Sequence, residues 1–324
     1  MGGDIIKELK KYNLLGRSGS GFPTALKWEL VKKAKGEKKY IICNCSEGEP
    51  KNFKDKFILE NYPEIIIEGI KTALNFIDNS SAFIYLKKDY YTKFYKKLKK
   101  LSKGLPIEIV KKKGGYLGGE ETVICQSLEG KRIEPRAKPP FPVESGLWNC
   151  PTLVNNAETF YCVGKIAKGE YQRTRFYTIS GDVKREGIYE LPEKYTIREI
   201  LKETKNYPDF EFFLQSGGGA IGEILLPEEL DKQVQGIGCI VVFDSQTNPF
   251  DLMKEWSQFF LAENCDKCTP CREGIYRINE MLNDKKIDEE SLKDIFLTLK
   301  ETSLCPLGAN AYKPFETLIK KIIR

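Results

Sequence analysis

The stretch KYIICNCSEGEP, residues 39–50, decides the fold of the N-terminal half of this chain. Its first seven residues, Lys39–Cys45, contain the run Tyr-Ile-Ile-Cys and predict a buried β-strand. Small and polar residues follow directly, from Ser46 to Pro50, and predict a loop. In α/β proteins, ligands bind at loops that follow the carboxyl ends of the strands. The stretch therefore predicts an inner strand that leads into a ligand-binding loop.

Helices and strands alternate around this strand. Apolar periodicity predicts further strands at residues 81–86 and 106–110, and a lysine-rich helix between them. The other expected helices span residues 4–12, 24–34, 63–76, 118–130 and 156–167. Such alternation indicates an α/β domain with a mostly parallel sheet, here a Rossmann-like domain over residues 1–168.

The pattern changes after residue 168. Strands are expected at residues 173–180, 187–191, 210–215 and 238–243, with a short helix at 196–203. Two strands, a helix and two strands in one short segment predict a small β-grasp (ubiquitin-like) domain over residues 169–247. Helices are then expected at 250–263, 272–282 and 289–300, which predicts a C-terminal helical bundle over residues 248–324.

Four cysteines in this C-terminal part have the spacing of metal ligands. Cys265, Cys268 and Cys271 are separated by two residues each, and Cys305 follows in the run SLCPLG. Three closely spaced thiolates and one remote thiolate suit an iron–sulfur cluster with one cysteine per iron. Zinc also binds four cysteines, but structural zinc sites usually pair two C-x-x-C knuckles. The pattern favours an iron–sulfur cluster and leaves zinc as the alternative.

The composition excludes several kinds of chemistry. The chain has 324 residues and no histidine, which excludes Ser-His-Asp triads, Rieske-type centres and His-ligated haem. Its net charge of +6 is concentrated in the lysine-rich stretch 87–113, where Tyr90, Phe94, Leu98 and Leu101 recur at helical spacing. A solvated face of an amphipathic helix explains these lysines better than a nucleic-acid site. We therefore expect no nucleic-acid partner.

The sequence also bears on location. It has no apolar run long enough to cross a bilayer and no signal-peptide core, so direct membrane insertion is not expected. Ten cysteines in such a chain indicate metal ligands and reduced core thiols rather than disulfides. We expect a cytoplasmic protein, or one peripheral to the membrane through partner subunits.

Three glycine-rich loops suggest a nucleotide pocket. They span residues 16–21, 44–50 and 114–122, and each follows a strand or opens a helix. The first has neither the Gly-Lys-Ser/Thr ending of a P-loop nor the preceding strand of a dinucleotide fingerprint. Glycines nevertheless let backbone amides turn toward a phosphate near a helix N-terminus. A flexible turn is the alternative for the first loop taken alone, and for the third loop the alternative is that its acidic residues only stabilise a helix N-terminus.

Six consecutive motifs resemble the NADH-binding flavoprotein subunit of respiratory complex I. The same family includes diaphorase subunits of NAD-linked hydrogenases and formate dehydrogenases. The motifs run in the family's order through nearly the whole chain: GRSGSGFPTALKW (16–28), CNCSEGEP (43–50), YLGGEET (116–122), EGKRIEPRAKPPFP (129–142), PTLVNNAET (151–159) and CDKCTPCREG (265–274).

The resemblance implies specific ligands and residues. It implies an FMN bound by ten residues: Gly16, Arg17, Gly19, Lys27, Asn44, Tyr116, Gly119, Asn155, Asn156 and Thr159. NADH is expected to stack against Phe22 and Phe141, with its polar parts at Glu47, Glu49, Glu120, Glu121 and Lys138. A [4Fe–4S] cluster is expected on the four cysteines named above.

The implied activity converts a two-electron donor into a source of single electrons. NADH would pass a hydride to FMN, which would release electrons singly to the cluster, and the reverse flow would reduce NAD+. The hydride passes directly between the cofactors, so no catalytic residue is expected. The electrons would leave to a thioredoxin-like [2Fe–2S] subunit and further subunits of a larger oxidoreductase. The terminal acceptor, the parent complex and the oligomeric state are not encoded in recognisable motifs.

Two positions depart from the family's pattern and keep alternatives open. Ser46 stands where an acidic residue is usual, and Leu30 where an aromatic residue often stacks on adenine. Use of NADPH or another donor with the same cofactors is therefore the first alternative. A non-catalytic electron-transfer or docking subunit with a decayed flavin site is the second.

Overall fold

The computed structural model describes residues 4–323, which form two compact units. The first comprises the chain up to Gly48 together with Phe53–Phe176, and the second comprises Glu49–Asn52 and the chain from Tyr177 onward. The segment Glu49–Asn52 thus belongs to the second unit although both of its neighbours along the chain belong to the first. The division into domains at residues 1–168, 169–247 and 248–324 stays a prediction.

A four-stranded parallel sheet forms the centre of the first unit. Its strands are β1 (Lys39–Cys45), β2 (Ser80–Leu86), β3 (Ile107–Lys111) and β4 (Thr152–Asn156), in the order β3-β2-β1-β4. All three pairings are parallel, with Ile42 opposite Phe83 and Val154. The expected parallel sheet is confirmed, and Lys39–Cys45 is an inner strand of it. β4 was not among the strands predicted from the sequence.

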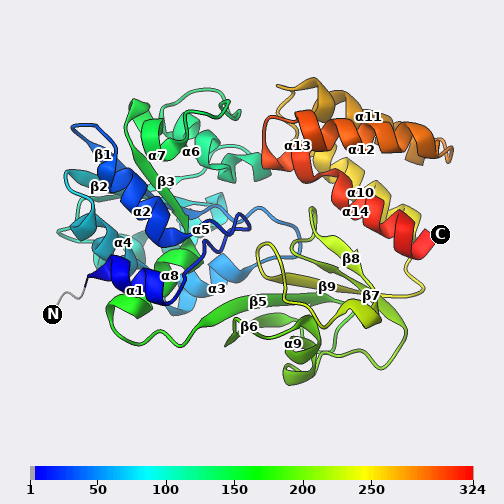
Figure 1. Cartoon of the computed structure of the whole chain (residues 1–324), viewed down its shortest axis with the longest axis horizontal. Coiled ribbons are helices and arrows are strands. Elements are labelled where there is room, and N and C mark those ends of the chain that lie inside the picture. The colour runs from blue at the N-terminus through cyan, green and yellow to red at the C-terminus, as the bar shows by residue number, and fades with distance from the viewer. Residues whose placement is uncertain (1–3, 324) are drawn as a thin grey trace. The chain divides into compact units, whose positions relative to one another are not determined.

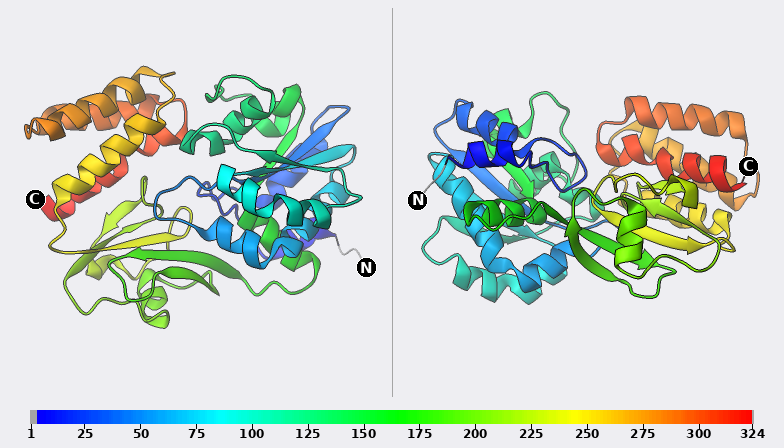
Figure 2. Two further views of the ribbon diagram at one scale, coloured as in Figure 1. Left: turned by 180° about the vertical axis from the view of Figure 1, so that it is seen from behind. Right: turned by 60° about the horizontal axis from the view of Figure 1, so that its bottom comes forward.

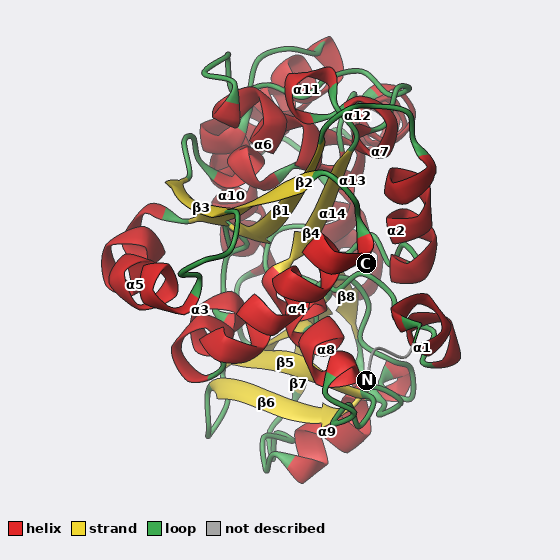
Figure 3. Cartoon of the chain, turned by 90° about the vertical axis from the view of Figure 1, so that its left-hand side faces the viewer, coloured by secondary structure: helices red, strands yellow, loops and turns green. Residues whose placement is uncertain are grey.

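Helices cover both faces of this sheet (Figure 3). α4 and α8 pack on one face, and α6 lies on the other, where Ile124 and Cys125 contact Tyr40 and Tyr85. The helices of the first unit are α1 (Ile5–Lys11), α2 (Thr24–Lys33), α3 (Lys54–Asn61), α4 (Pro63–Phe76), α5 (Lys88–Leu101), α6 (Glu121–Leu128), α7 (Pro142–Ser145) and α8 (Ala157–Ala167). Short 3-10 turns at Tyr116–Gly119 and Leu147–Asn149 join them.

The lysine-rich helix has the expected amphipathic form. In α5, Tyr90, Phe94 and Leu98 are buried, and the lysines between them are mostly exposed. Two of these lysines, Lys93 and Lys97, lie 2.7 and 3.9 Å from glutamates of neighbouring helices. The lysines therefore form a solvated face, as the sequence indicated.

A five-stranded sheet forms the centre of the second unit. Its strands are β5 (Thr174–Gly181), β6 (Gly187–Pro192), β7 (Phe212–Ser216), β8 (Glu223–Leu225) and β9 (Cys239–Asp244), in the order β6-β5-β9-β7-β8. β5 and β9 are parallel, whereas β7 runs antiparallel to both β8 and β9. Helix α9 (Ile197–Glu203) covers the sheet with Ile197, Ile200 and Leu201.

The chain ends in helices that lie together in both views of Figure 2. They are α10 (Pro249–Glu263), α11 (Thr269–Asn283), α12 (Glu289–Thr302), α13 (Pro306–Asn310) and α14 (Tyr312–Leu318). Phe315 of α14 packs against Trp256 and Phe260 of α10, with ring centroids 5.7 and 6.3 Å apart. Figure 1 shows α13 and α14 completing this group in red. Over residues 4–323, no helix is long and apolar enough to cross a membrane.

Glycines allow α4 and α8 to pack unusually closely. A Cβ built on Gly69 of α4 would lie 2.0 Å from the Phe160 carbonyl oxygen, and one on Gly164 of α8 would lie 2.2 Å from the Ile65 carbonyl oxygen. Such distances are far below van der Waals contact, so each glycine is required by the backbone opposite it.

Replacing Gly69 by Ala should lower the free energy of unfolding by about 1–3 kcal/mol, the usual cost of overpacking a core. Alanine favours helix over glycine by about 1 kcal/mol, so a loss of stability would isolate the steric clash. Urea denaturation followed by circular dichroism measures the change. Lys71→Ala on the exposed side of α4 serves as the control. Equal or greater stability of the Gly69→Ala protein would contradict the close packing.

Candidate functional site

The first glycine-rich loop, residues 16–21, connects α1 to α2. Its ends are joined by a hydrogen bond of 2.9 Å from the Gly16 amide to the Phe22 carbonyl. Gly19 and Gly21 have φ of 102° and 60°, conformations that residues with a side chain rarely adopt. A Cβ built on Gly21 would meet nothing within 4 Å. Glycines therefore set the backbone of the loop and leave space beside it.

Arg17 fixes this loop to helix α8. Its backbone N–H donates to Thr159 Oγ1 over 3.0 Å, and its carbonyl accepts from Lys54 Nζ over 3.0 Å. Its guanidinium group donates to the Tyr171 hydroxyl over 2.9 Å. Thr159 lies in the first turn of α8, where the helix dipole favours an anion. The structure thus brings the loop together with the first turn of α8, two segments whose residues the resemblance assigned to FMN.

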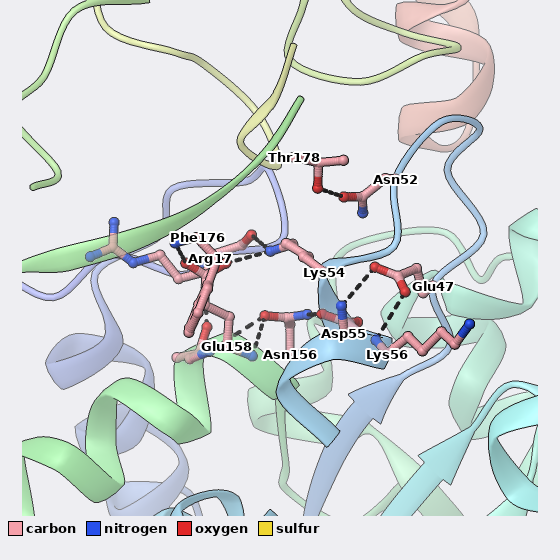
Figure 4. Close-up of polar contacts among 11 residues, drawn as sticks. Arg17, Glu47, Asn52, Lys54, Asp55, Lys56, Asn156, Glu158, Phe176 and Thr178 are labelled. Carbon is pink, nitrogen blue, oxygen red and sulfur yellow. Dashed lines mark hydrogen bonds and ion pairs between the residues drawn. The ribbon is translucent and has the colours of Figure 1, made fainter. Parts of the chain in front are cut away.

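A buried ion pair lies beneath this contact (Figure 4). Lys54 Nζ is 2.5 Å from Glu158 Oε2, and the two side chains are 2% and 0% exposed. The other carboxylate oxygen of Glu158 accepts from the Phe176 amide over 3.0 Å. Burial opposes ionisation of Glu158, but the positive charges of Lys54, Arg175 and Arg17 outweigh it and lower its pKa. Glu158 is therefore a carboxylate inside the protein.

Both polar atoms of the Asn156 side chain form hydrogen bonds within the protein. Its Oδ1 caps α8 by accepting from the amides of Glu158 and Thr159, over 2.9 and 3.4 Å. Its Nδ2 donates to both carboxyl oxygens of Asp55, over 2.9 and 3.1 Å. Burial and the nearby charge of Glu47 raise the pKa of Asp55 to about 8. Asp55 is therefore largely protonated at neutral pH.

Glu47 caps the next helix. Its carboxylate accepts from the amides of Asp55 and Lys56, over 2.8 and 3.2 Å, at the start of α3. It also accepts from the Tyr90 hydroxyl over 2.5 Å. Burial and the charge of Glu47 raise the pKa of Tyr90, which stays a hydrogen-bond donor. Glu47, predicted to contact NADH, thus has a structural role that the sequence analysis did not foresee.

The second and third glycine-rich loops meet at Asn44. Its Nδ2 donates to the Gly119 carbonyl over 2.9 Å, and its Oδ1 accepts from the Ser46 amide over 3.1 Å. A Cβ built on Gly119 would lie 2.5 Å from Ser46 Oγ, so the two loops touch. A Cβ built on Gly48 would likewise lie 3.1 Å from Tyr116. The structure therefore joins these predicted FMN residues in one place.

Acids and lysines form a compact cluster at the start of α6. Lys138 Nζ bonds Glu120 and Glu121 over 2.8 and 2.9 Å, and Lys27 Nζ lies 3.1 Å from Glu121. Burial opposes both charges, yet the pKa of Lys138 is raised by the two glutamates, and that of Glu121 is lowered by Lys27 and Lys138. Glu120 also caps α6 through the amides of Thr122 and Val123. All four predicted residues are charged and paired.

Other predicted residues are placed differently. Asn155 accepts from Trp28 Nε1 over 3.0 Å and helps to fix α2. Phe22 and Phe141 are 40% and 49% exposed. Glu49 belongs to the second unit, where its carboxylate accepts from the Ala220 amide over 2.8 Å. The structure brings most of the predicted nucleotide residues together in the first unit but does not group Glu49 with them.

Helix α2, which follows the first loop, contains Thr24 and Leu30. Thr24 is the first residue of the helix, and Pro23 occupies the cap position. Among the described residues, the buried Thr24 hydroxyl has no hydrogen-bond partner. Leu30, in place of an aromatic residue, is 40% exposed on α2.

The four cysteines with metal-ligand spacing come together in the second unit. Cys268 and Cys305 precede the first residues of α11 and α13, and Cys271 lies in the first turn of α11. A Cβ built on Gly308 would lie 3.3 Å from Cys271 Cβ, so α13 adjoins this turn. Burial and the charges of Cys268, Cys305 and Cys265 raise the pKa of Cys271 to about 12. Cys271 thus lies within electrostatic range of Cys265, Cys268 and the remote Cys305.

Within residues 4–323, no group of three or more His, Cys, Asp and Glu side chains is arranged to hold a metal ion. An iron–sulfur cluster takes one thiolate on each of four irons, so its ligands do not converge on a single ion. The remaining cysteines are buried, except for the half-buried Cys150. Cys43 and Cys45 lie with their sulfurs 3.6 Å apart and are free thiols.

Three residues of the site were not predicted from the sequence: Lys54, Asp55 and Glu158. They lie beside predicted residues along the chain, but charged side chains are usually exposed, so sequence alone gave no reason to expect their burial. The one available signal was their position, since Glu158 follows Asn155 and Asn156 at the start of an expected helix.

Comparison with known families accounts for most of the chain. The profile described as the Nuo51 FMN-binding domain matches residues 9–165. The profile described as the NADH-ubiquinone oxidoreductase-F iron-sulfur binding region matches residues 251–322. The first match covers the three glycine-rich loops, and the second covers the four cysteines with metal-ligand spacing.

Individual relatives extend over nearly the full chain. An NADH-quinone oxidoreductase subunit of Rhizobium meliloti (strain 1021) is 32% identical, covering 98% of this chain and 86% of its own. NADP-reducing hydrogenase subunit HndC of Solidesulfovibrio fructosivorans is 31% identical, covering 96% and 73%. A crystal structure of NAD+-reducing [NiFe]-hydrogenase in the H2-reduced state aligns with a TM-score of 0.89 and 29% identity. It covers 98% of this chain, which spans 61% of that hydrogenase chain.

Replacing Asp55 by Asn should make stability less dependent on pH. Asp55 titrates near pH 8 in the folded protein but near about 3.9 when unfolded, so its contribution to stability falls as pH rises between these values. Asparagine keeps the uncharged form. The stability of the variant relative to the parent should therefore increase with pH, by at most roughly 6 kcal/mol between acid pH and pH 9.

Urea denaturation at pH 5, 7 and 9 measures this difference. The exposed Asp78→Asn is the control, whose difference from the parent should not change with pH in this way. If Asp55→Asn and its parent keep a constant difference in stability from pH 5 to 9, the buried carboxyl does not carry the proton assigned to it.

Proposed function

The chain belongs to the family of NADH-binding flavoprotein subunits found in NADH-quinone oxidoreductase, and from this membership we propose which residues serve each step. It is an NADH dehydrogenase module with FMN, an iron–sulfur cluster and NADH as its ligands. One observation carries the assignment of function: an FMN-binding domain and an iron–sulfur binding region follow each other in a single chain.

We assign FMN to the three loops of the first unit. The assigned residues are Gly16, Arg17, Gly19, Lys27, Asn44, Tyr116, Gly119, Asn155, Asn156 and Thr159. The open space beside Gly21 and the first turn of α8 suit a phosphate. Since the side chains of Asn155 and Asn156 are already bonded within the protein, they serve FMN chiefly by fixing the backbone around it.

We assign NADH to the exposed aromatic rings and the charged cluster. Phe22 and Phe141 offer exposed ring faces for stacking, and the cluster of Glu120, Glu121 and Lys138 offers charged groups for hydroxyls and amides. Glu47 and Glu49 are buried and hold backbone amides, so their contribution to NADH would require exchange of these bonds. Of the five residues predicted to contact the polar parts of NADH, Glu120, Glu121 and Lys138 are therefore better supported than Glu47 and Glu49.

We assign the iron–sulfur cluster to Cys265, Cys268, Cys271 and Cys305. Four thiols and no other ligand type are the donor set of a [4Fe–4S] cluster. Two of the four are buried, which limits access of water and of oxidants, and two are half-buried at the ends of helices. Cluster binding would remove the thiol protons, because the thiolate is the ligand.

FMN, when bound, supplies the exchange between the hydride of NADH and single electrons. The protein provides position rather than acid–base groups for this exchange, which suits a chain without histidine. The same arrangement permits NADH oxidation or NAD+ reduction. One relative named above is an NADH-quinone oxidoreductase subunit, and the aligned solved structure is an NAD+-reducing hydrogenase.

Partners and the finer architecture follow from the same membership. We propose a thioredoxin-like [2Fe–2S] subunit as the next electron carrier, and attachment to a larger oxidoreductase, peripheral to any membrane part. We also propose that the five-stranded sheet with α9 is a β-grasp domain. On this proposal helices α10–α14 form a separate helical bundle around the cluster, which would give three domains at residues 1–168, 169–247 and 248–324.

NADPH is the second candidate donor. The relative HndC is named as a subunit of an NADP-reducing hydrogenase. Ser46 and Leu30 depart from the family's pattern at positions expected to contact the flavin or nicotinamide and the adenine, respectively. These two observations keep NADPH as the alternative to NADH.

Anaerobic spectra of the full-length protein with FMN and a reconstituted cluster test the proposed function. We expect flavin absorption in nearly equal amount to protein, and its loss on addition of NADH, with a weaker response to equal NADPH. If the flavin absorption were lost on addition of NADPH but not of NADH, NADPH would replace NADH as the proposed donor. Protein that binds zinc but no flavin would overturn both.

Replacing Cys268 by Ser should separate the two cofactors. Loss of one thiolate should remove or destabilise the cluster, measured by iron and sulfide content, because each iron needs its own thiolate. Reduction of the flavin by NADH should persist. Cys150→Ser, a half-buried cysteine outside the four, is the control and should keep full iron content. Full iron content in Cys268→Ser would contradict the proposed ligand set.

A further inference from the structure

Lys54 has an unusual position for a lysine. It is the first residue of α3, yet it is 2% exposed, and its ammonium group lies between two separate parts of the site. It donates to the Arg17 carbonyl over 3.0 Å and to the Glu158 carboxylate over 2.5 Å (Figure 4). A buried ammonium group is costly unless such acceptors satisfy it. Both acceptors are therefore part of what keeps Lys54 inside.

The two bonds of Lys54 link the first glycine-rich loop to α8. Arg17 is held from both sides: its N–H bonds Thr159 on α8, and its carbonyl bonds Lys54, which itself bonds Glu158 on α8. The peptide groups before and after Arg17 are thereby fixed. The glycines that follow Arg17, at positions 19 and 21, would otherwise give the loop a wide choice of conformations.

We propose that Lys54 is a positioning residue of the flavin site, which holds the loop of residues 16–21 against the first turn of α8 and so prepares it for the phosphate of FMN. The proposal rests on the proposed function. Lys54 touches no ligand in this account and acts through Arg17. Its effect is preorganisation: when the binding-competent conformation is populated only in part, the apparent dissociation constant rises by the inverse of that fraction.

The same contacts could serve stability alone, and the two roles have different consequences. A purely structural ion pair would affect the unfolding temperature but leave the affinity of the folded protein for FMN unchanged. A positioning residue would weaken FMN binding in protein that is fully folded. The affinity for FMN in folded, flavin-free protein therefore distinguishes them.

The experiment compares Lys54→Met, the double variant Lys54→Met/Glu158→Gln and Lys56→Met in the full-length chain. The double variant removes both charges of the Lys54–Glu158 pair and keeps similar shapes, so neither partner of the pair is left as a buried charge without the other, and the protein should fold even where the single variant does not. Lys56 lies two residues further along α3, is exposed, and provides the matched control. FMN affinity is measured by quenching of flavin fluorescence in flavin-free protein, and folding by thermal unfolding and circular dichroism.

We expect the apparent dissociation constant for FMN to rise at least tenfold in the folded double variant and to change less than twofold in Lys56→Met. In FMN-saturated double variant, the KM for NADH should stay at the parent value. A rise of less than tenfold in the double variant would overturn the positioning role. If the parent protein itself bound no FMN, the proposed function would fail instead, so the two failures are distinguishable.

Discussion

The buried ion pair of Lys54 and Glu158 is the interaction on which the proposed flavin site depends. Two opposite charges that are almost fully removed from water must satisfy each other, and each also bonds a backbone group. Removing one partner of such a pair commonly costs about 3–5 kcal/mol, whereas replacing both is often tolerated. The pair therefore restricts which residues can surround it, whereas its net contribution to the stability of the fold is smaller. The loop of residues 16–21 and the start of α8 meet where it lies.

Many other polar side chains of the proposed site are also hydrogen-bonded within the protein. Asn156 and Glu120 cap helices α8 and α6, Glu47 bonds the first amides of α3, and Thr159 accepts from the glycine-rich loop. Each of these three helices thus has its first turn fixed by a side chain. The loops are placed by these caps, so a ligand would meet a backbone that is already ordered.

The sequence predicted the parts of the molecule that have a local signature. Apolar runs identified β1, β2 and β3, and the density of glycine identified the loops. It missed β4, whose five residues end in Asn155 and Asn156, and the short helices α13 and α14, which contain Pro306 and Pro314. It also missed Lys54 and Glu158 as site residues, because burial of a charge depends on a partner more than one hundred positions away. Local patterns carry no information about such a pair.

In such a site the protein positions the cofactors, and the cofactors supply the chemistry. Hydride transfer between NADH and a flavin requires alignment but no general base, so the buried charges can serve position alone. Asp55 illustrates the point, since its carboxyl group bonds the capping Asn156 and keeps its proton up to about pH 8. An ionised carboxylate there would add a second negative charge next to Glu47. Protonation of Asp55 therefore allows two acidic residues to fix two neighbouring helices without mutual repulsion.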